Sequence, residues 1–182
     1  AILGRVRDYW AEVGPTRGFL NSKPWYYARL WEPISNLGSS CDYIHQPVLE
    51  TASIEGENLV CGEMSYKAVI LTDVESLTPK AAQKLEAFAS AGGKVVFVDN
   101  KPHRSLSFKN AESNDAIVAG AVENMLKSSH AFQIDGPEET ADFIAWTKKL
   151  MEKTELQPQV IISNPTSHLY FMKQKSGEQD VY

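Results

Sequence analysis

Cysteine and histidine are residue types that act as nucleophiles or bind soft metals, and this sequence contains two cysteines and four histidines. Cys41 and Cys61 lack the C-x-x-C spacing of a zinc or redox site, so we interpret them as ordinary core or half-buried thiols. A single disulfide between them stays open as an alternative. The histidines are scattered and form no H-x-x-x-H pair that would place two ligands on one helix face. They are His45, His103, His130 and His168.

A catalytic cysteine on an α/β sheet stands on a tight, glycine-flanked turn that leads from a strand into a helix. Cys41 follows a predicted helix and precedes a strand, and Cys61 is followed by Gly62 but by no helix. The adjacent carboxylates Glu138 and Glu139 are interpreted as charges at the start of a helix. No G-x-G-x-x-G or G-x-x-x-x-G-K-[ST] loop follows the first strand. We therefore assign no catalytic residue and expect no cofactor and no metal.

Polar side chains follow two predicted strands at the point where each strand ends. Asp73 comes after the first of these strands, and Asp99 and Asn100 come after the second. A further predicted strand places Asn164 in the same way. Parallel α/β sheets bind ligands at the carboxyl ends of their strands, so these residues are candidate ligand-binding residues. The alternative is that they cap the strand ends and hold loops together.

An aromatic cluster near residue 25 is the feature that favours carbohydrate as a ligand. Trp25 and Tyr26 are the candidates for exposed rings on which a sugar could stack. Tyr27, Trp31 and Ile34 recur at helical spacing, which is typical of a core face or an interdomain contact. Binding of carbohydrate is therefore kept as an alternative function for this chain.

The elements that must position these residues begin with a strand–helix–strand unit. Residues 67–73 and 94–99 are short, β-branched apolar runs, which predict buried strands. Between them, Thr78 and Pro79 form a helix start, and Gly92 with Gly93 ends that helix. Such a unit has parallel strands and a right-handed connection. We predict a three-layer α/β/α sandwich with a mainly parallel sheet, flavodoxin-like or like the class I glutamine amidotransferases.

Weaker patterns predict the remaining elements. Strands are predicted at residues 1–3, 42–44, 159–163 and 168–175, with a return strand from 180 and a hairpin or irregular excursion at 53–64. Helices are predicted near 6–13, over 24–37 with Pro33 as a kink or break and Gly38 at the end, over 115–128, and from 136 onward. A polar loop is predicted from 100 to about 113. Two regions result: an α/β domain over residues 1–165, and the truncated start of a following β-hairpin or β-sandwich over residues 166–182.

The bulk composition excludes two classes of partner. The 182 residues carry a net charge of −5 with dispersed basic residues, which argues against nucleic-acid binding. No apolar stretch approaches the roughly 20 residues that span a bilayer, so we expect no membrane span. The composition does not indicate a compartment.

Several motifs, taken in order, resemble a known domain. They are C-D-Y-I at 41–44, I-E-G-E-N-L at 54–59, M-S-Y-K-A-V-I-L at 64–71, L-T-P at 77–79 and A-G-G-K-V-V at 91–96. This order resembles the amidotransferase-like domain of large glycoside hydrolases related to the family 106 α-L-rhamnosidases. The tail, H-L-Y-F at 168–171 and G-E-Q-D-V-Y at 177–182, is similar to the hairpin that opens their next β-sandwich. Asp73 stands where the family commonly has proline. A related possibility is the similar amidotransferase-like domain of family 42 β-galactosidases, which takes part in subunit assembly.

The resemblance implies a non-catalytic structural or interdomain module of a carbohydrate-degrading enzyme. In these domains the sheet persists without the Cys–His machinery of the amidotransferases, and the catalytic acids lie elsewhere in the parent. The implied partners are a catalytic barrel and a β-sandwich of the same polypeptide, and the implied parent is secreted or periplasmic. An independent amidotransferase- or peptidase-type enzyme remains a further alternative.

Overall fold

The computed structural model describes residues 1–4, 24–166, 168–169, 174–176 and 179–181. The chain divides into two compact units, which we describe separately. The sheet unit comprises Ala1–Pro24 and Tyr43–Gly136, and the helical unit comprises Trp25–Asp42 and Pro137–Tyr182. The helix predicted near residues 6–13 lies outside the described residues.

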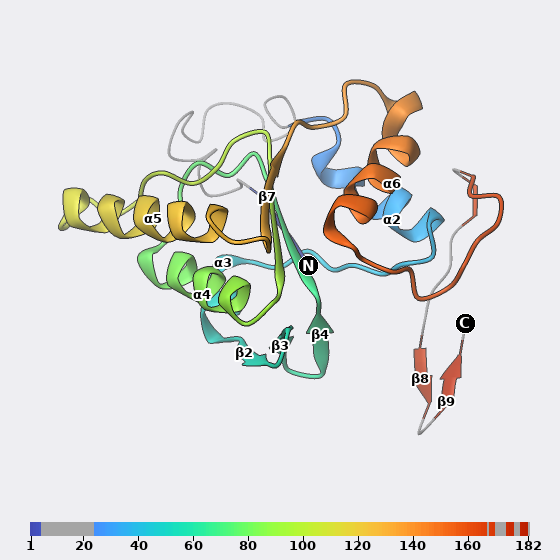
Figure 1. The fold of residues 1–182 in the computed structure, drawn as a ribbon, viewed down its shortest axis with the longest axis horizontal. Helices are drawn as coiled ribbons and strands as arrows, with labels where there is room; N and C mark the ends of the chain where they lie inside the picture. Colours follow the sequence, from blue (N-terminus) through green and yellow to red (C-terminus); the bar gives the residue numbers. More distant parts are fainter. Residues whose placement is uncertain (5–23, 167, 170–173, 177–178, 182) are drawn as a thin grey trace, which may run out of the picture. The chain divides into compact units, whose positions relative to one another are not determined.

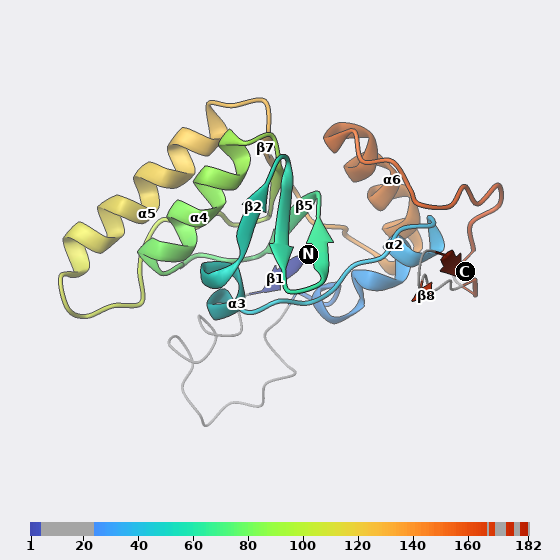
Figure 2. The same cartoon turned by 90° about the horizontal axis from the view of Figure 1, so that it is seen from below.

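A four-stranded parallel sheet forms the centre of the sheet unit (Figures 1 and 2). Its strands are β1 (Ile2–Gly4), β5 (Ala68–Thr72), β6 (Lys94–Val98) and β7 (Ala131–Ile134), hydrogen-bonded in that order. The two central strands, β5 and β6, are buried on both faces, as their continuous apolar runs predict for a parallel sheet. The predicted α/β class and the parallel sheet are therefore confirmed.

The outer edge of β1 carries a rudiment of a further strand. Tyr43 forms an isolated parallel bridge with Ile2, and the Ile44 amide donates to the Ile2 carbonyl at 2.9 Å. The strand predicted at 42–44 is thus reduced to one bridge. Pro47, in the helix that follows at once, limits its length, because proline has no N–H for a ladder.

Two helices lie side by side over one face of the sheet (Figures 1 and 2). Helix α4 (Pro79–Ser90) begins where Thr78 Oγ1 accepts a hydrogen bond from the Ala81 amide at 3.2 Å, and it ends before Gly92, which has φ +104°. Leu85 and Phe88 of this helix are fully buried against the sheet. Both predicted ends of α4 are confirmed. Helix α5 (Ala111–Leu126) starts four residues before the predicted 115, after the left-handed Asn110.

Helix α3 (Gln46–Thr51) and a small antiparallel sheet complete the described sheet unit. This sheet consists of β2 (Ser53–Glu55), β3 (Asn58–Cys61) and β4 (Met64–Tyr66). Its two-residue connections begin at Gly56 and Gly62, with φ of +60° and +63°, as tight hairpins require. The hairpin predicted at 53–64 is confirmed and gains a third strand.

In the helical unit, the 3₁₀ turn η1 (Tyr27–Arg29) leads into helix α2 (Trp31–Asn36). The kink or break predicted at Pro33 is wrong, because Pro33 lies in the first turn of α2, where its missing N–H removes no helical bond. The break falls at Leu30 instead, and Gly38 ends the helix with φ +82°, as predicted.

The 3₁₀ turn η2 (Thr140–Asp142) precedes α6 (Phe143–Thr154), so this helix begins later than residue 136. Phe143 and Leu150 of this helix are buried. At the end of the chain, β8 (Gln174–Ser176) and β9 (Gln179–Val181) form an antiparallel pair, so the predicted return of the chain is confirmed. The residues before 174 in the predicted strand 168–175 are not described as strand, and 170–173 lie outside the described residues. Among the described residues, no helix is long and apolar enough to cross a membrane.

The strand predicted at 159–163 is wrong. The amides of Gln159 and Val160 both donate to the Gly38 carbonyl, at 2.8 and 3.0 Å, instead of to a neighbouring strand. Ile161 is 87% exposed, so this β-branched run lies on the surface as an irregular segment. The sheet's last strand is β7, which was not predicted because it is short and its Gln133 interrupts the apolar pattern.

Candidate functional site

The carboxyl edge of the parallel sheet brings together the candidate ligand-binding residues that follow β5 and β6. Asp73 and Asp99 both adopt left-handed backbone conformations, with φ of 52° and 62°, which aspartate tolerates better than most residues. Their amides donate to the carbonyls of Val98 and Ile134, both at 2.9 Å. Each residue therefore closes the ladder of its strand and turns the chain sharply away from the sheet.

The side chains at this edge join one loop to the next. The side-chain Nδ2 of Asn100 donates to Asp73 Oδ1 at 2.6 Å, and the backbone N–H of Gly136 donates to Asp99 Oδ1 at 2.6 Å. Gln133 Nε2 also donates to the Asp99 carbonyl at 2.9 Å. The alternative of strand-end capping and loop bonding thus describes what these three candidates do. Asn164 does not belong with them, because it lies on a surface segment of the helical unit that follows no strand.

A second connection fixes the loop after β6 to the loop after β5. Arg104 and Glu75 form an ion pair at 3.0 Å, and Ser76 and Arg104 form a parallel bridge. The His103 amide donates to the Glu75 carbonyl at 2.9 Å, and the Leu77 amide donates to the Arg104 carbonyl at 3.1 Å. Sequence reasoning missed the Arg104–Glu75 pair because only the fold brings the two residues together.

The side chains at the carboxyl edge of the sheet limit the reactions and ligands that this edge could support. Its carboxylates are engaged by amide donors and by an arginine. No group of three or more histidine, cysteine, aspartate or glutamate side chains that could hold a metal ion occurs among the described residues.

Neither cysteine has the properties of a nucleophile. Both are free thiols, so the disulfide left open by the sequence is absent. Burial raises the pKa of the Cys41 thiol to about 11 and also raises the pKa of the Cys61 thiol. A raised pKa keeps a thiol protonated at neutral pH, and the protonated form is a poor nucleophile.

The two candidate sugar-stacking residues differ in how far their side chains are exposed. Trp25 is 38% exposed, but Tyr26 is only 3% exposed, so the prediction that Tyr26 presents its ring to a sugar is wrong. Trp31, which the helical spacing assigned to a packed stripe, is 40% exposed. The reason is the 3₁₀ turn η1, whose three residues per turn shift the phase of the pattern away from 3.6.

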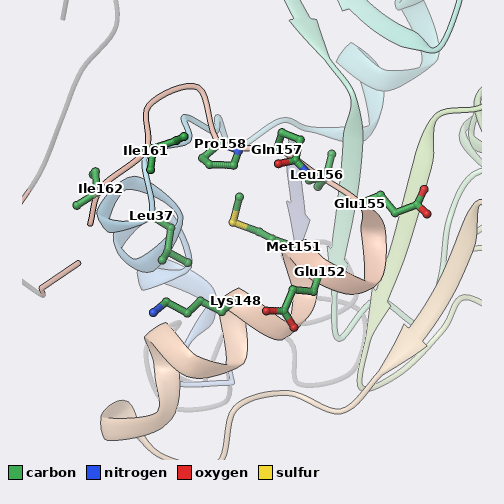
Figure 3. A pocket seen from close by; sticks show the side chains of 10 residues that line it. All are labelled: Leu37, Lys148, Met151, Glu152, Glu155, Leu156, Gln157, Pro158, Ile161 and Ile162. Carbon is green, nitrogen blue, oxygen red and sulfur yellow. The ribbon is translucent and has the colours of Figure 1, made fainter. Parts of the chain in front are cut away.

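A pocket of about 390 Å³ opens on the surface of the helical unit (Figure 3). Its walls come from the end of α2, from α6 and from the segment after α6, and in Figure 3 the Met151 side chain extends from α6 toward Pro158. The lining is mainly apolar, with charged residues on α6. It consists of Leu37, Lys148, Met151, Glu152, Glu155, Leu156, Gln157, Pro158, Ile161 and Ile162. The sequence did not reveal this pocket, because residues 159–163 were interpreted as a strand.

No family model, no curated protein and no solved structure matches this chain.

Proposed function

We propose that this chain is a non-catalytic structural module of a larger carbohydrate-degrading enzyme of the α-L-rhamnosidase type, in which it contacts other domains of the same polypeptide. One observation carries the proposal. At the carboxyl edge of the sheet, Asp73, Asp99 and Asn100 are engaged in loop-to-loop hydrogen bonds at 2.6 Å. These contacts tie neighbouring loops to one another, which supports a structural role for this edge.

The finer fold belongs to the same proposal: a flavodoxin-like, three-layer sandwich. The strand order supports it. With the Tyr43 bridge counted as a second strand outside β1, the order along the sheet becomes 2-1-3-4-5, which is the flavodoxin-like order. Burial of Ile70, Val96 and Val98 on the face opposite α4 supports a further covering layer.

The properties of the two thiols favour a structural module over an independent amidotransferase or peptidase. An enzyme of that kind needs a thiolate, and the raised pKa values of Cys41 and Cys61 disfavour it. Apolar surface supports a role in domain contacts. Ile161, which is 87% exposed, and the mainly apolar pocket that it helps to line present to solvent the kind of surface that interdomain contacts bury.

The open reading frame that contains this chain tests the proposal. We expect a barrel-sized α/β region before Ala1 and a β-rich region after Tyr182 in the same frame. A frame that encodes little more than these 182 residues would overturn it. In a longer protein, deletion of residues 1–165 should abolish soluble expression of the neighbouring domains, whereas full activity without them would also contradict a structural role.

A further inference from the structure

The pocket of the helical unit is built along one side of helix α6. Its lining residues on this helix recur every three or four positions, which places them on a common side. They are Lys148, Met151, Glu152 and Glu155. The adjacent side of α6, which includes Leu150, packs inward and is buried. The pocket therefore lies beside the core of this unit, on the same helix.

Hydrogen bonds hold the wall that is formed by the segment after α6. The Leu156 amide donates to the Met151 carbonyl at 3.0 Å, which turns the chain back along the helix. The amides of Gln159 and Val160 donate to the Gly38 carbonyl, which ties the same segment to the end of α2. The pocket is thus formed without a ligand, so binding requires little further ordering of the chain.

The size and the lining of the pocket suit a small ligand with an apolar group. Its volume of about 390 Å³ falls within the range of roughly 300–1,000 Å³ that small-molecule sites occupy. Leu37, Leu156 and Pro158 are half-buried in its walls, and Met151 extends between them in Figure 3. The thioether of methionine adapts its shape to a guest and makes favourable contacts with aromatic rings.

Two opposite charges stand at the exposed edge of the pocket, one helical turn apart. Lys148 and Glu152 are both exposed, and Figure 3 shows them next to each other on α6. Within the described part of the chain, neither side chain forms an ion pair or a hydrogen bond. A lysine four residues before a glutamate is also the weaker order for pairing on a helix. Glu155, by contrast, points away from Met151. Lys148 and Glu152 are therefore available to a ligand.

We propose that this pocket binds a free apolar α-amino acid, of which phenylalanine is the probe. The ammonium and carboxylate groups of an amino acid leave the same carbon, so two side chains whose Cβ atoms lie about 5–6 Å apart can reach both. The ammonium faces Glu152, the carboxylate faces Lys148, and the apolar side chain packs against Met151. A fatty acid would meet the like charge of Glu152, and an apolar amine would meet that of Lys148. A zwitterion is the occupant that matches both.

A nuclear magnetic resonance titration of the 182-residue chain, labelled at its methionine methyl groups, tests the site. We expect phenylalanine to shift the Met151 methyl signal saturably, with a dissociation constant on the order of 1 mM. Met151→Leu assigns this signal. The methyl signals of Met64 and Met125, which lie in the sheet unit, should not move. The absence of a saturable Met151 shift up to about 20 mM phenylalanine would overturn the proposal.

Analogues that lack one or both charges separate an amino acid from other occupants. Phenylpropionate lacks the ammonium and phenethylamine lacks the carboxylate, so each should bind about two- to fivefold more weakly than phenylalanine, having lost one exposed ion pair. N-acetylphenylalaninamide is uncharged, resembles a side chain within a protein, and should bind most weakly. Binding of any analogue as tightly as phenylalanine would refute the proposal. For the amide, that result would assign the pocket to a side chain of another domain.

Variants connect each charge of the ligand to one residue. Glu152→Gln should remove most of the difference between phenylalanine and phenylpropionate, and Lys148→Met should do the same for phenethylamine. The matched control is Lys149→Met, because Lys149 is exposed on α6 but does not line the pocket. It should leave every affinity unchanged. If the differences between the analogues persist in both Glu152→Gln and Lys148→Met, with circular dichroism like the wild type, these charges do not orient the ligand and the assignment is wrong.

This proposal and the structural-module proposal fail separately. The reading frame and the deletion variant test the module without any amino acid. A short reading frame would overturn the module, while the titration would still report on the pocket.

Discussion

Gly38→Ala tests how the helical unit is held together. Gly38 has φ +82°, and a Cβ added there would lie 1.8 Å from the carbonyl oxygen of Val160. The two segments cannot simply move apart, because the Gly38 carbonyl accepts hydrogen bonds from the amides of Gln159 and Val160. The left-handed conformation costs alanine about 1–2 kcal/mol. Losing the two hydrogen bonds costs about 0.5–1.5 kcal/mol each. We therefore expect the free energy of unfolding to fall by about 2–5 kcal/mol.

Urea unfolding followed by tryptophan fluorescence measures this change, because Trp25, Trp31 and Trp146 all lie in the helical unit. The control is Gly56→Ala, followed by circular dichroism. Gly56 has φ +60°, but its added Cβ meets no described atom within 4 Å, so only the cost of about 1–2 kcal/mol for the left-handed conformation applies. Equal losses in the two variants would refute the reasoning, because they would mean that the contact with Val160 contributes nothing.

Three further predictions follow from the described contacts. Burial holds the Cys41 pKa at about 11, so about one thiol in a thousand is ionised at pH 8, and alkylation by iodoacetamide should still rise about tenfold per pH unit up to pH 10; a plateau near pH 9 would contradict this. Leu85→Ala, in the core between α4 and the sheet, should lower the free energy of unfolding by about 2–5 kcal/mol, against less than about 0.5 kcal/mol for Phe108→Ala. Thr78→Ala removes the cap of the Ala81 amide and should cost about 1 kcal/mol by urea denaturation; no change would show that water replaces the cap.

Local signals were sufficient for the unit of β5, α4 and β6. Its strands are continuous apolar runs. Its helix begins after Thr78 and ends just before Gly92, so each boundary is encoded within a few residues. Residues 159–163 show the opposite case. Their β-branched composition favours a strand, but the amides of Gln159 and Val160 donate to the carbonyl of Gly38, which is distant in sequence. Tertiary hydrogen bonding outweighed propensity there.

The position of the candidate site could be predicted from the sequence, but the hydrogen bonds that its side chains form could not. Strand ends identified Asp73, Asp99 and Asn100, because parallel strands deliver their carboxyl ends to one edge. The pattern could not reveal that Asp73 is bonded to Asn100, since this contact depends on how adjacent loops turn. Tyr26 was predicted to be exposed, but Tyr26 is buried and Trp31 is exposed, and the cause is similar. A single 3₁₀ turn shifts which residues face outward, and the 3.6-residue pattern does not record it.

The most direct test of the proposal that this module is non-catalytic is a turnover assay of the purified 182-residue chain. The substrates are 4-nitrophenyl glycosides, including the α-L-rhamnoside, together with glutamine for ammonia release. The interlocked carboxylates and the protonated thiols predict no release above the buffer blank, both for the wild type and for Asp73→Asn. Turnover by the wild type that is lost in Asp73→Asn, or lost on alkylation of Cys41, would contradict the proposal that this module is non-catalytic.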